Sequence, residues 1–256
     1  MSVISQEKTE AILLLLSNIE SERNIKVIHA VESGSRAWGF PSVDSDYDVR
    51  FIYCQEKDWY ITPFDRKDTI DISMQGDLDA GGWDIGKCLS LLYKGNAVLQ
   101  EWLNSPVVYR SNSKMHQALR DFAAKEFNSA AAFYHYISLA KRKFLDETTA
   151  SNAKYFLYGL RAVLCAQFIA DNKQVPPVLF DTLVKKYIPD SEVPGLNQLL
   201  KYKSLGGEKD QLVISPALWD FSIAMFERLQ AVSFERFRHS DSESYEKLMR
   251  MVVSGF

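Results

Sequence analysis

The chain has 256 residues, of which 46% are hydrophobic and 25% charged, and a formal net charge of −3 at pH 7. This is ordinary usage for a globular protein, and it excludes a disordered chain, a collagen-like repeat and a small disulfide-dependent scaffold. The slight excess of acidic residues argues against an extended basic surface for nucleic acid, although a local basic patch is compatible with it.

The 3 cysteines are scattered without a Cys-x-x-Cys pair, which is typical of a reducing compartment. The N-terminal residues lack a signal-peptide pattern, and the apolar run Ala11 to Leu16 is too short to span a bilayer. Neither end carries a lipidation motif. We therefore expect a cytoplasmic protein with no membrane partner.

Hydrophobic periodicity divides the first part of the chain into helices and strands. Residues 4–22 show the spacing of an amphipathic helix, and the apolar run around Val27 to Val31 is typical of a strand buried on both faces. Three more strands are predicted at 46–54, 69–73 and 77–80, the last ending at Gly81-Gly82. Helical spacing then returns at 83–95 and 96–103.

From Ser113 onward the sequence shows almost no strand signal. Helices are predicted at about 113–126, 128–147, 150–172, 178–187, 194–203, 215–238 and 241–252. The sequence therefore predicts an α+β protein, with a mixed-sheet catalytic core over residues 1–110 and an all-α domain over residues 111–256.

Two aspartates at the start of the second strand form a candidate metal site. Asp46 and Asp48 are two positions apart, so in an extended strand both side chains project from one face, about 6.6–6.8 Å apart along the axis. Two such carboxylates repel each other unless a cation lies between them. Mg²⁺ suits the pair because it takes oxygen ligands and shares them with substrate phosphates.

A turn of small residues precedes these aspartates. Gly34 follows the first buried strand and permits unusual backbone angles and close approach of a ligand. The Ser35 hydroxyl and neighbouring N–H groups can donate to a phosphate. A phosphate-binding turn followed by two metal-binding carboxylates predicts nucleotide chemistry.

These residues stand in longer segments that resemble a known group of proteins. Gly-Ser followed by Asp-x-Asp resembles the DNA polymerase beta-like nucleotidyltransferase superfamily. The wider pattern is similar to a predicted nucleotidyltransferase family of bacteria and phages, whose relatives are associated with RNA repair. The segments are ESGSRAWGF, SDYDVRFIY, GGWDIGKCLSLLYKGN, EWLNSPVVY and KxxxYxxR from Lys154 to Arg161. The resemblance covers most of the chain and implies a mixed-sheet catalytic core followed by a helical domain.

The resemblance also implies a third carboxylate from a neighbouring strand. Asp79 is the first choice, because it directly precedes the Gly-Gly-Trp segment where the family pattern places an acidic residue, and Asp71 is the second choice. Asp84 is instead expected to cap the following helix. The candidate catalytic and Mg²⁺-binding residues are therefore Asp46, Asp48 and Asp79.

Cations are expected near the phosphates. Arg36 follows the Gly-Ser turn, and Lys87 lies one turn into its helix. Arg50 shares the face of the two aspartates, so it can pair with them or reach a phosphate. Further along, one helix face carries a stripe of three residues, at i, i+4 and i+7, that can stack on a base and bind phosphate. The same stripe is equally compatible with an amphipathic helix edge. The candidate nucleotide-binding residues are Gly34, Ser35, Arg36, Arg50, Lys87, Lys154, Tyr158 and Arg161.

Together these patterns predict a Mg²⁺-dependent nucleotidyltransferase that moves a nucleoside monophosphate from an NTP to a hydroxyl. The acceptor stays open between an RNA end, a protein and a small molecule, and so does the oligomeric state. An alternative is a non-catalytic nucleotide-binding or regulatory module with the same fold. A further possibility is an antitoxin-like enzyme that modifies a partner protein.

Overall fold

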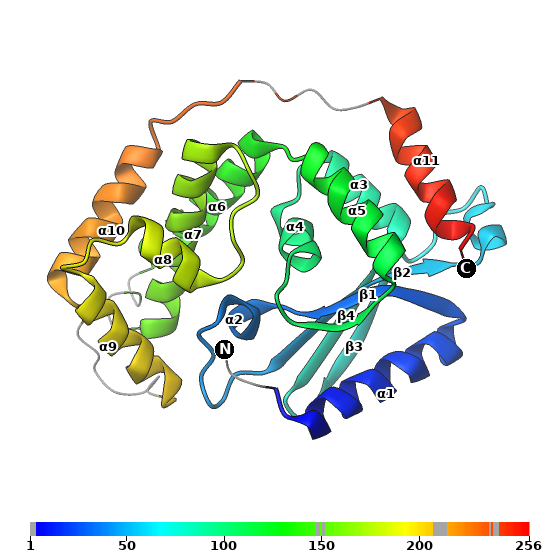
Figure 1. Ribbon diagram of the computed structural model, residues 1–256, viewed down its shortest axis with the longest axis horizontal. Coiled ribbons are helices and arrows are strands. Elements are labelled where there is room, and N and C mark those ends of the chain that lie inside the picture. The colour runs from blue at the N-terminus through cyan, green and yellow to red at the C-terminus, as the bar shows by residue number, and fades with distance from the viewer. Residues whose placement is uncertain are drawn as a thin grey trace. The chain divides into compact units, whose positions relative to one another are not determined.

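A computed structural model describes residues 4–146, 149, 152–206, 214–235, 237 and 241–255, and for residues 73–75 the backbone alone. The strands are β1 (Ile25–Glu32), β2 (Tyr47–Gln55), β3 (Thr69–Gln75), β4 (Leu78–Asp84) and β5 (Val108–Ser111). The helices are α1 (Gln6–Arg23), α2 (Gly34–Trp38), η1 (Lys57–Tyr60), α3 (Ile85–Tyr93), α4 (Ala97–Leu103), α5 (Ser113–Lys125), α6 (Ser129–Phe144), α7 (Ala153–Asn172), α8 (Phe180–Tyr187), α9 (Val193–Ser204), α10 (Pro216–Leu229) and α11 (Ser242–Val253) (Figure 1).

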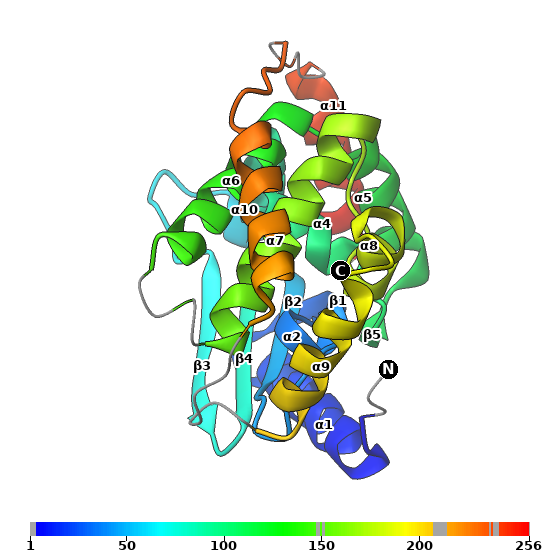
Figure 2. The ribbon, with the colours of Figure 1, turned by 90° about the vertical axis from the view of Figure 1, so that its left-hand side faces the viewer.

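The strands form one mixed sheet in the order β3-β4-β2-β1-β5. β2 pairs in parallel with β4, and the remaining neighbours are antiparallel. Figure 2 shows β3 at the edge of the sheet, next to β4. The predicted α+β class with a mixed sheet is thereby confirmed.

A hydrophobic core lies on each face of the sheet (Figure 1). α1 begins at the Ser5 cap, ends at Asn24 in the left-handed region with φ 51°, and buries Ile12, Leu16 and Ile19 against one face. α3, α4, α5 and α11 bury their apolar side chains against the opposite face. Strand alternation therefore directs successive β2 residues to different cores, Phe51 toward α1 and Ile52 toward α3.

The sequence prediction ends the fourth strand at the glycine pair, but β4 continues through it to Asp84. The pairing register explains this, because Gly82 lies beside Phe51 of β2. A Cβ on Gly82 would lie 2.2 Å from the Phe51 ring, so the glycine makes room for that ring within a continuous strand. Three short elements, α2, η1 and β5, have no counterpart among the predicted segments, and α10 ends at Leu229, earlier than predicted.

The chain divides into two compact units. The sheet unit comprises Met1–Ala37, Asp46–Phe127 and Arg238–Phe256, and the helical unit comprises Trp38–Ser45 and Asn128–Phe237. Within the helical unit, the loop after α2 is held by α9, where Lys203 Nζ donates to the Phe40 carbonyl at 2.9 Å. α7 is the most buried helix of this unit and packs against α6.

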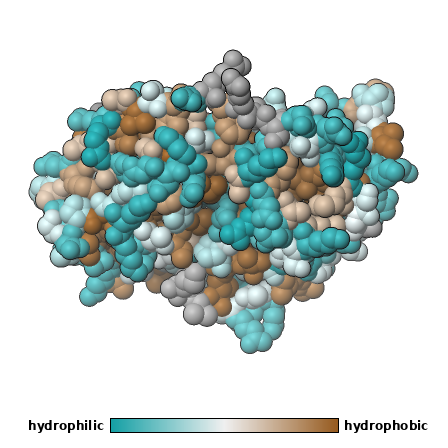
Figure 3. Space-filling view, turned by 45° about the horizontal axis from the view of Figure 1, so that its top comes forward, coloured by the Kyte–Doolittle hydropathy of each residue, from teal (hydrophilic) through white to brown (hydrophobic). Residues whose placement is uncertain are grey.

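On the face shown in Figure 3, hydrophilic side chains of the described residues alternate with smaller hydrophobic areas. None of the described helices is both long and apolar enough to cross a membrane.

Candidate functional site

Two of the predicted carboxylates lie side by side on neighbouring strands. Asp48 of β2 is the register partner of Asp79 of β4, and parallel partners project from the same face of a sheet. Nη2 of Arg50 contacts both of them, at 3.2 Å from Asp48 Oδ1 and 2.6 Å from Asp79 Oδ2. The fold therefore brings Asp48 and Asp79 to one point, and the cation between them is a guanidinium.

Gly34 packs directly against this pair. Its φ of +61° lies in the left-handed region that favours glycine, and a Cβ there would be 2.4 Å from Asp48 Oδ2. The carboxylate of Asp48 is thus seated against the backbone of the Gly-Ser turn. Ser35, the next residue, lies in the first turn of α2 and is buried.

Arg36 is held beside the start of β2. Its Nε donates to the main-chain carbonyl of Asp46 at 3.0 Å, and its guanidinium lies 3.9 Å from the centre of the Tyr47 ring. Lys8 contacts the same ring at 4.8 Å. The Asp46 side chain is exposed at this end of the strand.

Glu32, the last residue of β1, is not among the site residues predicted from the sequence. Its carboxylate is fully buried and accepts two hydrogen bonds, one from the Asp48 N–H at 2.9 Å and one from the Tyr109 hydroxyl. Burial raises the pKa of Glu32 to about 7, against the opposing effect of the Tyr109 hydrogen bond. The available signal was a lone carboxylate at the end of an apolar strand, immediately before the Gly-Ser turn.

The other sequence candidates of the sheet unit have partners of their own. Asp71, with 75% of its side chain exposed, is 3.4 Å from Lys67, and Lys87 pairs with Asp68 at 3.0 Å. Asp84 caps α3 by accepting the Gly86 N–H at 2.7 Å, as predicted. The geometry therefore joins Asp79, and not Asp71, to the Asp48–Arg50 contacts.

The three stripe residues lie on α7 of the helical unit. Lys154 is exposed near the N-terminus of the helix, and Tyr158 is half-buried with its ring 5.0 Å from that of Trp38. Arg161 is only 2% exposed, lies 4.2 Å from the centre of the Trp38 ring and donates to the Val178 carbonyl at 3.3 Å. The stripe thus runs from exposed to buried, and Arg161 packs inside its unit.

The ligands that the carboxylate pair offers can be compared with those that Mg²⁺ takes. No group of three or more His, Cys, Asp or Glu side chains is arranged as metal ligands within the described part of the chain. Magnesium, however, commonly takes one or two protein carboxylates and completes its shell with water and substrate phosphate. Two carboxylate oxygens that already meet at one cationic nitrogen fit that requirement.

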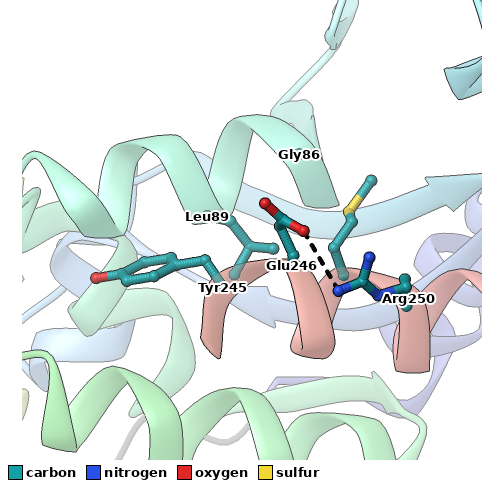
Figure 4. A pocket seen from close by; sticks show the side chains of 6 residues that line it. Gly86, Leu89, Tyr245, Glu246 and Arg250 are labelled. Atoms are coloured by element: carbon teal, nitrogen blue, oxygen red, sulfur yellow. Dashed lines mark ion pairs between the residues drawn. The ribbon is translucent and has the colours of Figure 1, made fainter. Parts of the chain in front are cut away.

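A separate cavity of about 370 Å³ lies between α3 and α11 (Figure 4). Leu89 and Tyr245 form its apolar wall, and the ion pair of Glu246 and Arg250, 3.3 Å apart, lies along its side. It contains none of the predicted site residues.

A model of the RNA repair pathway DNA polymerase beta family matches residues 9–253, and the chain belongs to this family. The resemblance seen in the sequence is thereby confirmed.

Two individual proteins are also similar. The uncharacterized protein YcgL of Bacillus subtilis (strain 168) is 36% identical over 223 residues, which covers 86% of each chain. A nucleotidyltransferase-like protein from Exiguobacterium sibiricum 255-15 aligns with 97% of this chain and 80% of its own, at 11% identity and a TM-score of 0.33.

Proposed function

We propose that this protein is a Mg²⁺-dependent nucleotidyltransferase that transfers a nucleoside monophosphate from an NTP to a hydroxyl. The observation that carries the proposal is the alignment of Asp48 and Asp79 on adjacent parallel strands, with Gly34 packed against Asp48. The family's description in terms of RNA repair favours an RNA end as acceptor over a protein or a small molecule.

In the proposed reaction, an oxygen of the acceptor hydroxyl bonds to the α-phosphorus of the NTP, and the bond to pyrophosphate breaks. Asp46, Asp48 and Asp79 would hold the metal, which when bound neutralises phosphate charge and makes the acceptor hydroxyl more acidic. Asp79, on the neighbouring strand, accepts the proton that this hydroxyl loses.

The remaining residues position the reactants, which is the main contribution of a protein to phosphoryl transfer. Gly34 and Ser35 provide the backbone turn for the triphosphate, and Arg36 and Arg50 supply positive charge beside it. Glu32 anchors the start of β2 through the Asp48 N–H. As the sequence predicts, Lys87 and the cations of the α7 stripe contact phosphate in this proposal, and Tyr158 stacks on the base.

The test is transfer of label from α-³²P-labelled ATP, GTP, CTP or UTP to bulk RNA in the presence of Mg²⁺. We expect wild-type protein to label RNA with one or more of these nucleotides, and Asp48→Asn to lose the transfer. Asp121→Asn is a matched control, because Asp121 lies on α5 and its carboxylate contacts Gln117 at 2.7 Å. Equal labelling by wild type and Asp48→Asn would contradict the proposal.

A non-catalytic nucleotide-binding module is the second candidate, and the position of Arg50 favours it. A guanidinium that bridges Asp48 and Asp79 neutralises the site without a metal. This function predicts that wild-type protein binds NTP in equilibrium dialysis, equally with Mg²⁺ or EDTA, while no label moves to RNA, protein or small molecules.

A further inference from the structure

Arg50 occupies an unusual position within the carboxylate pair. Besides its Nη2 contacts to Asp48 and Asp79, its Nη1 donates to the Val49 carbonyl at 3.0 Å and to the Asp79 carbonyl at 3.2 Å. The side chain is 22% exposed. Arg50 is thus held by two main-chain carbonyls at one nitrogen and by two carboxylates at the other.

The neighbouring strand packs against this arrangement. Gly81 is the register partner of Arg50, and a Cβ on Gly81 would lie 3.8 Å from Nη1 and 3.9 Å from Cδ. Both are ordinary van der Waals distances, so the guanidinium packs beside Gly81 and a Cβ there would fit against it. Arg50 thus places its positive charge over the paired strands β2 and β4.

The guanidinium and the proposed metal use the same two carboxylates. Mg²⁺ requires oxygens at 2.0–2.1 Å, roughly, and Nη2 already takes one oxygen of Asp48 and one of Asp79. A metal held by the same two carboxylates would lie close to this guanidinium, and the two like charges repel each other, so that metal binding weakens or displaces the guanidinium contacts. The displaced guanidinium then needs a new anion, because a half-buried charge without a partner is unfavourable. A polyphosphate is the anion that the proposed reaction brings.

We propose that Arg50 is a built-in counter-ion that competes with the divalent metal for Asp48 and Asp79, so that the metal binds tightly only together with a polyphosphate. The inference rests on the proposed nucleotidyltransferase function for the identity of the metal and the polyphosphate. It assigns to Arg50 a positioning role and makes metal affinity and NTP affinity depend on each other.

The direct test measures Mn²⁺ affinity by the loss of the free-ion EPR signal, without nucleotide. We expect Arg50→Gln to bind Mn²⁺ about tenfold more tightly than wild type. In wild type, metal binding costs about one charge-assisted hydrogen bond of Arg50, and the variant has no such bond to lose. Arg50→Lys keeps the charge but cannot bridge four acceptors, so its affinity is expected to lie between the two. An Arg50→Gln affinity equal to or below that of wild type overturns the inference.

Arg110→Gln is the matched control, because Arg110 pairs with Glu20 at 2.6 Å in the same unit and is 26% exposed. Arg110→Gln is expected to bind Mn²⁺ as tightly as wild type does. A tenfold higher Mn²⁺ affinity of this variant would show that the effect comes from net charge and would overturn the inference. Thermal melting supplies a second readout that also reports folding. Added Mn²⁺ should raise the melting temperature of Arg50→Gln more than that of wild type.

The second arm repeats the titration with the non-hydrolysable analogue α,β-methylene-ATP. We expect the analogue to strengthen Mn²⁺ binding by wild type at least tenfold and by Arg50→Gln much less, because Arg50 is the residue that links the two ligands. Equal enhancement in both proteins contradicts the inference.

The outcomes separate this inference from the proposed function. If Arg50→Gln gains Mn²⁺ affinity while wild type transfers no label, the inference stands and the transferase function fails. If wild type transfers label with Mg²⁺ but Arg50→Gln gains nothing, the function stands and the inference fails. Absence of Mn²⁺ binding in every protein and condition overturns both.

Discussion

The sheet unit and the helical unit each contain arginines from the predicted nucleotide-binding set, and they hold them differently. In the sheet unit, Arg50 contacts the carboxylates of Asp48 and Asp79 beside a backbone turn. In the helical unit, Arg161 is buried, stacks on the Trp38 ring and donates to a main-chain carbonyl.

The groups around a cation in a predicted site determine what that cation can do. A guanidinium paired with carboxylates at a half-exposed strand end can exchange partners when a metal or a phosphate arrives. A guanidinium enclosed by an indole ring is a packing element whose removal leaves a void and an unpaired carbonyl.

The largest expected effect is on activity at the carboxylate pair. Asp79→Asn should lower label transfer by about 10²- to 10³-fold, because stabilisation of phosphate charge by a correctly held metal is worth several kcal/mol. Asp71→Asn should retain activity, since Asp71 is largely exposed and contacts Lys67. Initial rates with the preferred NTP measure both, and the opposite ranking would make Asp71 the third carboxylate.

The next effect concerns the pH dependence of stability in the sheet unit. Burial, together with the neighbouring His116, lowers the pKa of His29 to about 4 from 6.5. Between those values the unfolded chain binds more protons than the folded one, so stability falls as pH falls through this window, by up to about 3 kcal/mol.

His29→Gln removes this contribution, and the variant should lose less stability than wild type between pH 6.5 and 4. Urea unfolding of the two proteins at matched pH values gives the difference curve. Parallel curves across that window would show that His29 does not stay neutral in the folded protein.

A smaller loss of activity is expected at the turn. Gly34→Ala places a Cβ 2.4 Å from Asp48 Oδ2, which should displace that carboxylate and reduce transfer by about 10- to 10²-fold. Gly76→Ala is the control, because Gly76 has a similar φ of +68° but no atoms within 4 Å of its Cβ position. Both variants should lose about 1 kcal/mol of stability from the backbone conformation, and only Gly34→Ala should lose activity.

The smallest effects are expected along α7. Arg161→Gln should destabilise the protein by about 2 kcal/mol, because it removes a buried cation from the Trp38 ring. Lys154→Gln, at an exposed position, should change stability by less than about 0.5 kcal/mol. If the stripe binds phosphate as predicted, Lys154→Gln weakens NTP binding by about two- to fivefold in a titration, the size of one exposed charge contact. An unchanged dissociation constant of Lys154→Gln for NTP would show that the stripe is only the edge of an amphipathic helix.

Much of the fold could be predicted because it follows from local periodicity. The spacing of apolar residues predicts α1 and α3 closely, and the β-branched run after Asp46 predicts β2. The short strand β5 could not be predicted, since its four residues become a strand only through pairing with β1. The glycine pair of β4 resembles a turn in sequence, but its pairing with β2 makes it a strand, and the ring of Phe51 explains the glycine at position 82.

The candidate site also has features that follow from local sequence and features that depend on distant residues. The two-residue spacing of Asp48 and Arg50 places both on one face of β2 without further information, because strand periodicity is a local property. The choice of Asp79 over Asp71 as the partner of Arg50 depends on the register of β4 against β2, which no local pattern contains. Glu32 and the burial of Arg161 likewise depend on residues distant in the chain, namely Tyr109 and Trp38.

The α+β class, the order of most elements, the Gly-Ser turn and the family could be predicted from the sequence, because short-range patterns carry them. The three-dimensional fold was needed to show which cation contacts which carboxylate, which arginine is buried, and that α11, from the far end of the chain, packs with α3 on the sheet unit. Pairing, burial and charge balance arise from contacts between distant segments, and these contacts form only when the chain folds.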